Sequence, residues 1–220
     1  MSVKVKVIGS ALLLFAVLTY LFAWSPVFTV RTISTMGAPA GVSEAALISK
    51  SEIRIGEKLS RIEPRSVERS LEELSWIKKA SIERDWIKGE VRITISPRIP
   101  VGMYKGKAID GSGTLFVIPG KVPAGLPQVT AASPQLGLEA ISLFTNLPTD
   151  IQQSIISVTA TNENYISSLQ EQNGRTLKVT WGSVQDLDLK VTVLQALLEL
   201  PENQSITRVD LSAPHAPIVK

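Results

Sequence analysis

Three groups of side chains have the types and spacing that chemistry requires. Asp110-Gly111-Ser112-Gly113 has the glycine content of a phosphate-binding loop, Asp186 and Asp188 are spaced like acid–base carboxylates, and His215 is a candidate base. The loop lacks the Lys-Ser/Thr of a P-loop and opens no helix, so a hairpin turn explains it better. The two Asp residues stand in the first turn of a predicted helix, where the helix dipole favours negative charge. His215 has no obvious partner, and we predict no catalytic residues.

The amino-acid composition excludes further classes of chemistry. The 220 residues include no Cys and one His, so disulfides, thiol nucleophiles, Fe–S clusters, Cys-ligated zinc and poly-His metal sites are impossible. Lys and Arg number 23 against 20 Asp and Glu, without a long basic run, which disfavours a nucleic-acid-binding protein. The sequence therefore predicts a protein that is not an enzyme and that uses no cofactor, metal or small-molecule substrate.

The N-terminal region has the composition of a membrane anchor. The 17 residues from Val7 to Ala23 carry no charge, and a helix over residues 7–24 is a short but sufficient span. A cleaved signal peptide is the alternative. The apolar stretch exceeds the usual length of a signal sequence, and Pro26 follows the only plausible cleavage site, so we favour an uncleaved anchor.

Charges around this segment predict its orientation. Lys4 and Lys6 precede the apolar stretch, and the positive-inside rule then makes residues 1–6 a cytoplasmic tail and residues 25–220 extracytoplasmic. The side chains expected at the membrane interface are Lys4, Lys6, Tyr20 and Trp24.

Residues 28–97 have the pattern of a small α+β unit. Alternation from Phe28 predicts a first strand, Ser43 is placed to cap a short helix, and Pro64 fits the first turn of a second helix. Helical spacing extends the apolar face of the second helix to Trp76 and Ile77.

A hairpin is expected after the second helix. Ala80–Arg84 and Val91–Ile95 alternate apolar and polar residues, and Gly89 lies where the turn requires positive φ. The order strand–helix–helix–strand–strand predicts a three-stranded sheet with helices on one face.

Residues 98–220 are predicted to form a larger, strand-rich unit with two inserted helices. The helices are expected at Leu136–Leu147 and Ser183–Leu200. Strands are expected on both sides of the Asp110 turn, at Ser157–Thr161, at Thr176–Trp181 and at Ile206–Leu211, with a loop over residues 119–134.

The C-terminal edge of this sheet is the candidate binding site. An edge strand leaves N–H and C=O groups unpaired, and a partner's strand can add there. A capped, inert edge is the alternative, and the residues alone leave both open.

The motifs described so far, taken in order, resemble the FtsQ/DivIB family of bacterial cell-division proteins over essentially the whole chain. The resemblance is carried by Ser75-Trp76-Ile77-Lys78-Lys79-Ala80-Ser81-Ile82-Glu83-Arg84-Asp85-Trp86, Val91-Arg92-Ile93-Thr94-Ile95, Arg98-Ile99-Pro100-Val101, Ile109-Asp110-Gly111, Leu126-Pro127, Trp181-Gly182-Ser183, Lys190 and Val209-Asp210-Leu211.

The resemblance implies a POTRA domain over residues 28–97 and a β domain over residues 98–220. It implies a non-enzymatic scaffold of the division septum that binds FtsB/DivIC-like and FtsL-like coiled-coil proteins. The partner-binding residues that it implies, at the C-terminal edge, are Arg208, Val209, Asp210, Leu211, Ser212, Pro214, Ile218 and Val219.

Two features depart from the family pattern. Pro97 replaces the Glu that often precedes the Arg of the family signature, and Pro214 and Pro217 cannot donate to an added strand. Partner contacts beyond Leu211 are therefore an open question at this point. The alternative function is that of a membrane-tethered POTRA protein acting in polypeptide export or envelope assembly.

Overall fold

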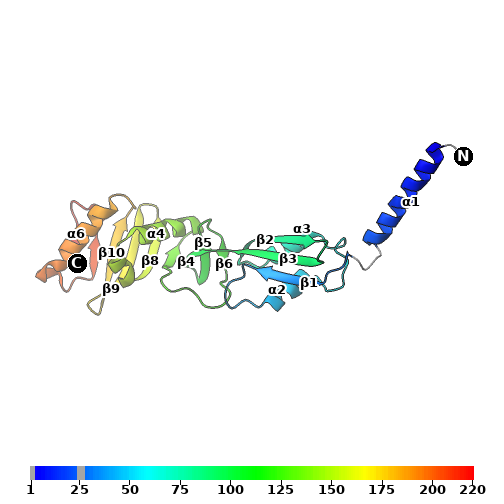
Figure 1. Ribbon diagram of the computed structural model, residues 1–220. Helices are drawn as coiled ribbons and strands as arrows, with labels where there is room; N and C mark the ends of the chain where they lie inside the picture. Colours follow the sequence, from blue (N-terminus) through cyan, green and yellow to red (C-terminus); the bar gives the residue numbers. More distant parts are fainter. Residues whose placement is uncertain (1–2, 24–27) are drawn as a thin grey trace. The chain divides into compact units, whose positions relative to one another are not determined.

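The computed structural model describes residues 3–23 and 28–220, and these divide into two compact units, Met1–Arg98 and Ile99–Lys220 (Figure 1). Helix α1, Val3–Ala23, takes in both N-terminal lysines and ends before Trp24, which lies outside the described residues. No helix among the described residues is both long enough and apolar enough to cross a membrane. The membrane span expected over residues 7–24 is therefore not found among the described residues.

The first unit is an α+β fold with a three-stranded sheet in the order β1-β3-β2. Strand β1 is parallel to β3, and β2 is antiparallel to β3. Helices α2 and α3 separate β1 from the β2–β3 hairpin along the chain. The elements are β1 Thr32–Met36, α2 Glu44–Ser51, α3 Pro64–Glu72, β2 Ile77–Asp85 and β3 Glu90–Pro97.

The pattern of apolar residues explains the hairpin. Val91, Ile93 and Ile95 alternate with polar residues and are buried, so they place one face of β3 in the core. Gly89 adopts a φ of +70°, as the turn requires, and a Cβ there would lie 2.6 Å from the carbonyl oxygen of Thr29. Both predictions for this hairpin are confirmed.

One prediction for the helices of this unit is wrong. The apolar face of α3 does not reach Trp76 and Ile77, because the helix ends at Glu72 and Ile77 begins β2. Ser43 occupies the predicted N-cap position of α2, although its hydroxyl makes no capping bond. Its backbone carbonyl instead accepts hydrogen bonds from the N–H groups of Ala46 and Leu47.

The second unit contains a nine-stranded sheet in the order β12-β11-β10-β9-β8-β7-β4-β5-β6. Three neighbouring pairs are parallel, β4–β7, β7–β8 and β10–β11, and the others are antiparallel. The strands are β4 Pro100–Tyr104, β5 Lys107–Asp110, β6 Leu115–Phe116, β7 Gln128–Ala131, β8 Ile155–Asn162, β9 Tyr165–Gln172, β10 Arg175–Gly182, β11 Arg208–Asp210 and β12 Ile218–Val219.

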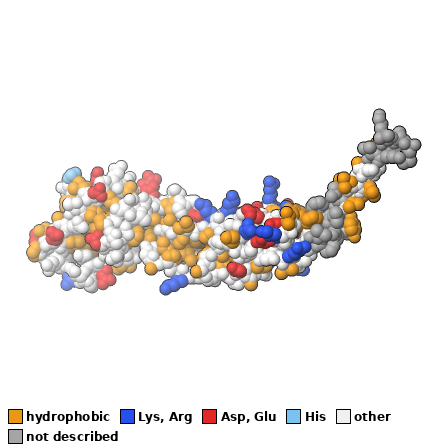
Figure 2. Space-filling view, in the orientation of Figure 1, with side chains coloured by type: hydrophobic (Ala, Val, Ile, Leu, Met, Phe, Trp, Pro, Cys, Tyr) orange, Lys and Arg blue, Asp and Glu red, His pale blue; other side chains and the backbone are white. Residues whose placement is uncertain are grey.

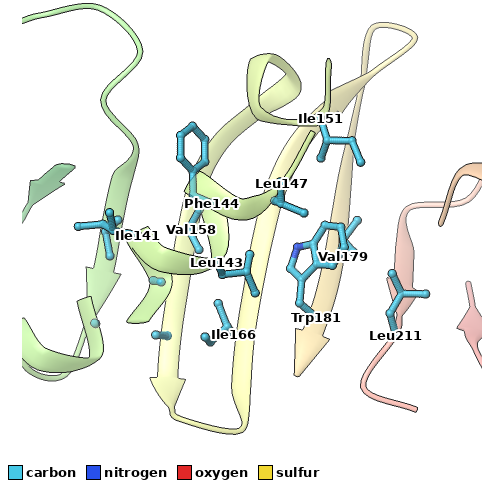
Figure 3. Packing of buried hydrophobic residues seen from close by; sticks show 14 of the residues in the cluster. Ile141, Leu143, Phe144, Leu147, Ile151, Val158, Ile166, Val179, Trp181 and Leu211 are labelled. Atoms are coloured by element: carbon cyan, nitrogen blue, oxygen red, sulfur yellow. The ribbon is translucent and has the colours of Figure 1, made fainter. Parts of the chain in front are cut away.

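Helices pack on this sheet and enclose its core (Figure 3). They are α4 Pro134–Asn146, α5 Thr149–Ser154 and α6 Leu187–Glu199, followed by the short 3-10 helix η2 Pro201–Asn203. The core combines helix residues such as Leu143 and Leu194 with strand residues such as Val158, Val179 and Trp181. Their burial supplies the main stabilising term of the unit.

Several elements of the second unit are absent from the sequence prediction. Strand β7 lies inside the segment expected to be a loop, and no expected element corresponds to β4, α5, β9, η2 or β12. In β9 the core-facing positions include Ser168 and Gln170, which remove the apolar alternation that marks a strand. Ser168 is nevertheless satisfied in the core, because its hydroxyl accepts a 2.9 Å hydrogen bond from Nε1 of Trp181.

Candidate partner-binding edge

The C-terminal edge of the nine-stranded sheet is formed by β12. Strand β11 lies between β10, to which it is parallel, and β12, to which it is antiparallel. The sequence predicts Ile206–Leu211 as the last clear strand, and the structure adds a further strand after it. The segment that follows returns alongside β11 and becomes the edge.

Backbone hydrogen bonds hold β12 in place. Arg208 and Lys220 exchange a reciprocal pair, each N–H donating to the other's carbonyl oxygen at 3.0 Å. The N–H of Thr207 donates to the same Lys220 carbonyl at 2.7 Å. The next residue pair, Val209 and Val219, is therefore a non-hydrogen-bonded pair of the antiparallel ladder.

This alternation directs the backbone of Val219 away from β11. Its N–H and C=O face outward, and no described residue pairs with them. The side chain of Val219 packs partly against the core, whereas that of Ile218 is 59% exposed. The edge thus offers one donor, one acceptor and a neighbouring exposed apolar side chain.

Two of the predicted partner-binding residues belong to the core of the domain. Val209 and Leu211 have no exposed side-chain surface, and the backbone N–H of Leu211 donates to Thr180 on β10 at 2.8 Å. The register of the parallel β10–β11 pair also directs the backbone N–H and C=O groups of Val209 toward β10. These side chains support the edge from within and do not reach its outer side.

Other predicted residues form the connection between β11 and β12. Oδ1 of Asp210 accepts hydrogen bonds from the backbone N–H of Ser212 at 2.9 Å and from its hydroxyl at 2.6 Å. This Asx turn directs the chain away from β11. Pro214 and Pro217 lie in the loop before Ile218, so neither occupies a donor position of β12.

The outer edge of β2, in the first unit, is closed by contrast. Oε1 of Glu72 accepts from the N–H of Ala80, and Oε1 of Glu68 accepts from the N–H of Ile82, each at 3.0 Å. Both carboxylates come from α3 and occupy the positions that an added strand would use. Strand addition therefore has a free site on β12 and a blocked one on β2.

Among the side chains singled out for chemistry, that of Asp110 has a structural role. Oδ1 of Asp110 accepts from the N–H groups of Ser112 and Thr114 and so builds the predicted β5–β6 hairpin turn. Asp186 precedes α6 without a side-chain capping bond, and Asp188 lies in its first turn. No cluster of metal-ligating side chains occurs among residues 3–23 and 28–220.

The predicted membrane-interface residues lie mostly outside the described part of the chain. Trp24 is not described, and neither are the side chains of Lys4 and Lys6. Tyr20 is described, and its side chain is 63% exposed on α1.

The architecture of a three-stranded α+β unit followed by a helix-backed sheet agrees with comparisons to known families. Residues 28–98 match the POTRA domain of FtsQ type, and residues 99–212 match the C-terminal domain of the cell division protein FtsQ/DivIB. The chain thus has the two-domain organisation of a POTRA-containing division protein.

It belongs to the FtsQ/DivIB family, whose members are generally non-enzymatic cell-division proteins. A relative from Streptomyces griseus, described as cell division protein FtsQ, is 27% identical over 201 residues, which cover 81% of this chain and 94% of the relative. The family match ends at residue 212, so β12 lies beyond the matched residues.

Proposed function

We propose that this protein is a non-enzymatic scaffold of the divisome that binds FtsB/DivIC-like and FtsL-like partners by strand addition to β12. The observation that carries the proposal is the outward-facing, unpaired backbone of Val219 at the C-terminal edge of the sheet. A partner strand that pairs there gains main-chain hydrogen bonds, while Ile218 supplies an apolar contact for specificity.

The proposal includes a single membrane anchor over residues 7–24, with the POTRA domain (28–97) and the β domain (98–220) outside the cytoplasm. The uncharged stretch from Val7 to Ala23 and the preceding lysines support this topology. Such an anchor confines the protein to the cell membrane and, through its partners, to the division septum. The match to a POTRA domain of FtsQ type favours division over a role in polypeptide export or envelope assembly.

Live-cell imaging tests the proposal when combined with partner capture. A fluorescent protein fused to the N-terminus should give a band at the division plane, and a uniform membrane signal would contradict the division role. Deleting residues 218–220 should abolish co-purification of the FtsB/DivIC-like and FtsL-like partners. This deletion is preferable to removing residues 206–220, because the longer segment includes the core residues Val209 and Leu211.

A further inference from the structure

Two loops of the first unit expose large apolar side chains on either side of the segment that begins it. Ile87, in the β2–β3 turn, is 90% exposed, and Ile55, in the loop between α2 and α3, is 72% exposed. A single exposed Ile is ordinary on a protein surface. Two of them at the tips of neighbouring loops indicate a common function.

Hydrogen bonds fix both loops to the same short segment. Each loop forms a backbone hydrogen bond with Val30 or with its neighbour Arg31. The carbonyl of Val30 accepts from Gly56 N–H at 2.8 Å, and the N–H of Arg31 donates to the carbonyl of Gly89 at 2.7 Å. In Figure 1 the β2–β3 turn and the start of β1 lie at the same end of the three-stranded sheet. The loops therefore flank residues 28–31.

Side-chain contacts make this arrangement rigid. Nη1 of Arg84 donates to the carbonyls of Leu59 at 3.0 Å and Ile62 at 2.8 Å, which ties the hairpin to the loop after α2. The same guanidinium lies 5.1 Å from the ring centre of Trp86, and that ring meets Phe28 edge-to-face at 6.1 Å. A surface held in this way loses little conformational entropy when it binds.

The connection to α1 limits how far this end of the unit lies from the helix. α1 ends at Ala23, and the described chain resumes at Phe28, five residues later. Five residues span at most about 18 Å when fully extended. If α1 anchors the protein, as proposed above, this end of the first unit is held within that distance of the membrane surface.

Charge around the loops suits an anionic surface. Residues 28–98 carry 13 basic and 10 acidic side chains, a net charge of +3, whereas residues 99–220 carry 8 and 10, a net charge of −2. On the face shown in Figure 2, Lys and Arg side chains gather over the first unit, with Asp and Glu side chains among them. The two loops, their flanking residues and Arg31 together carry six basic and five acidic side chains, a net charge of +1. The basic residues are Arg31, Arg54, Lys58, Arg61, Arg84 and Lys88, and the acidic residues are Glu52, Glu57, Glu63, Asp85 and Glu90.

We propose that these two loops form a proximal rim, defined by Ile55, Ile87, Arg31, Lys58 and Lys88, that docks on the anionic headgroup region of the membrane. The inference rests on the proposed anchor, because the short connection brings the rim to the bilayer. The two Ile side chains enter the interface between headgroups and acyl chains, and the basic side chains contact lipid phosphates. Docking orients the POTRA domain relative to the membrane plane.

The absence of native Cys makes a site-specific test direct. Single Cys substitutions at Ile55, Ile87, Leu13 and Ser96 are labelled with an environment-sensitive fluorophore in the full chain. Each protein is reconstituted in vesicles of phosphatidylcholine and phosphatidylglycerol that contain a lipid quencher. Ser96 is an exposed control near the opposite end of β3, and Leu13 reports on α1. We expect several-fold stronger quenching at Ile55 and Ile87 than at Ser96.

The labels at the four positions distinguish failure of the proposed rim from failure of the proposed membrane anchor. Quenching at Leu13, with Ile87 and Ile55 as unquenched as Ser96, would overturn the rim and leave the anchor intact. No quenching at Leu13 would overturn the anchor and the rim together. A Lys88→Glu substitution should at least halve the quenching of a label at Ile55, and unchanged quenching would overturn the contact with anionic headgroups.

Discussion

Replacing Val219 with proline should weaken partner binding without unfolding the β domain. The N–H of Val219 faces away from β11, so its removal costs no hydrogen bond within the protein. Proline is also compatible with an edge strand. The same change at Val209 would remove a donor directed into β10 and would damage the sheet itself.

The expected effect follows from one backbone hydrogen bond. Such a bond contributes about 0.5–1.5 kcal/mol, which corresponds to a roughly 2- to 12-fold increase in the dissociation constant. The proline ring also occupies the position of the donor, so steric exclusion adds to this loss. Val219→Ala is the matched control, because it shortens the side chain and keeps the N–H.

The assay is equilibrium binding of the full-length protein, in lipid nanodiscs, to the purified FtsB/DivIC-like and FtsL-like pair. Thermal unfolding of both variants serves as the folding control, and we expect their midpoints to agree closely. Equal affinity of Val219→Pro and Val219→Ala would refute strand addition through this N–H. A large drop in the unfolding temperature of Val219→Pro alone would refute the assignment of that N–H to the outer side.

Three further predictions concern stability. Glu72→Ala leaves the partly buried N–H of Ala80 without its partner and should lower the free energy of unfolding in urea by about 1–2 kcal/mol. Glu73→Ala, which loses only an exposed ion pair, should change it little. Ser168→Ala should cost about 1–3 kcal/mol in the same assay, because the buried Nε1–H of Trp181 loses its acceptor. Burial lowers the pKa of Lys190, an effect that Asp186 opposes, so the unfolded chain binds more protons than the folded one as the pH approaches 10.5. Urea midpoints should therefore rise with pH in the alkaline range for the wild type and stay flatter for Lys190→Met, and parallel pH profiles would contradict this reasoning.

The sequence predicts elements well where a local pattern coincides with burial. The β2–β3 hairpin is one example, since its apolar residues alternate and Gly89 occupies the turn. Strand β9 is the opposite case. Its core positions include Ser168 and Gln170, and their partners, Trp181 and Ser154, lie far away in the sequence. The spacing of apolar residues along the sequence does not reveal hydrogen bonds of this kind.

The candidate site shows the same limit. The sequence indicates a C-terminal edge, but it does not show that the edge is the two-residue strand β12. A strand of this length has no periodicity to detect, and its position depends on the reciprocal bonds between Arg208 and Lys220. From the sequence alone, Pro214 and Pro217 are expected to interfere with an added strand. In the structure they belong to the loop that allows the chain to return.

The carboxylates of Glu68 and Glu72 have a consequence for the behaviour of the first unit during partial unfolding. Both project from adjacent turns of the nine-residue helix α3. Fraying of that helix therefore uncovers the N–H groups of Ala80 and Ile82 in a single event. Local unfolding of this kind needs far less free energy than global unfolding. The conformational stability of α3 thus sets how often the β2 edge becomes available for aggregation between copies of the protein.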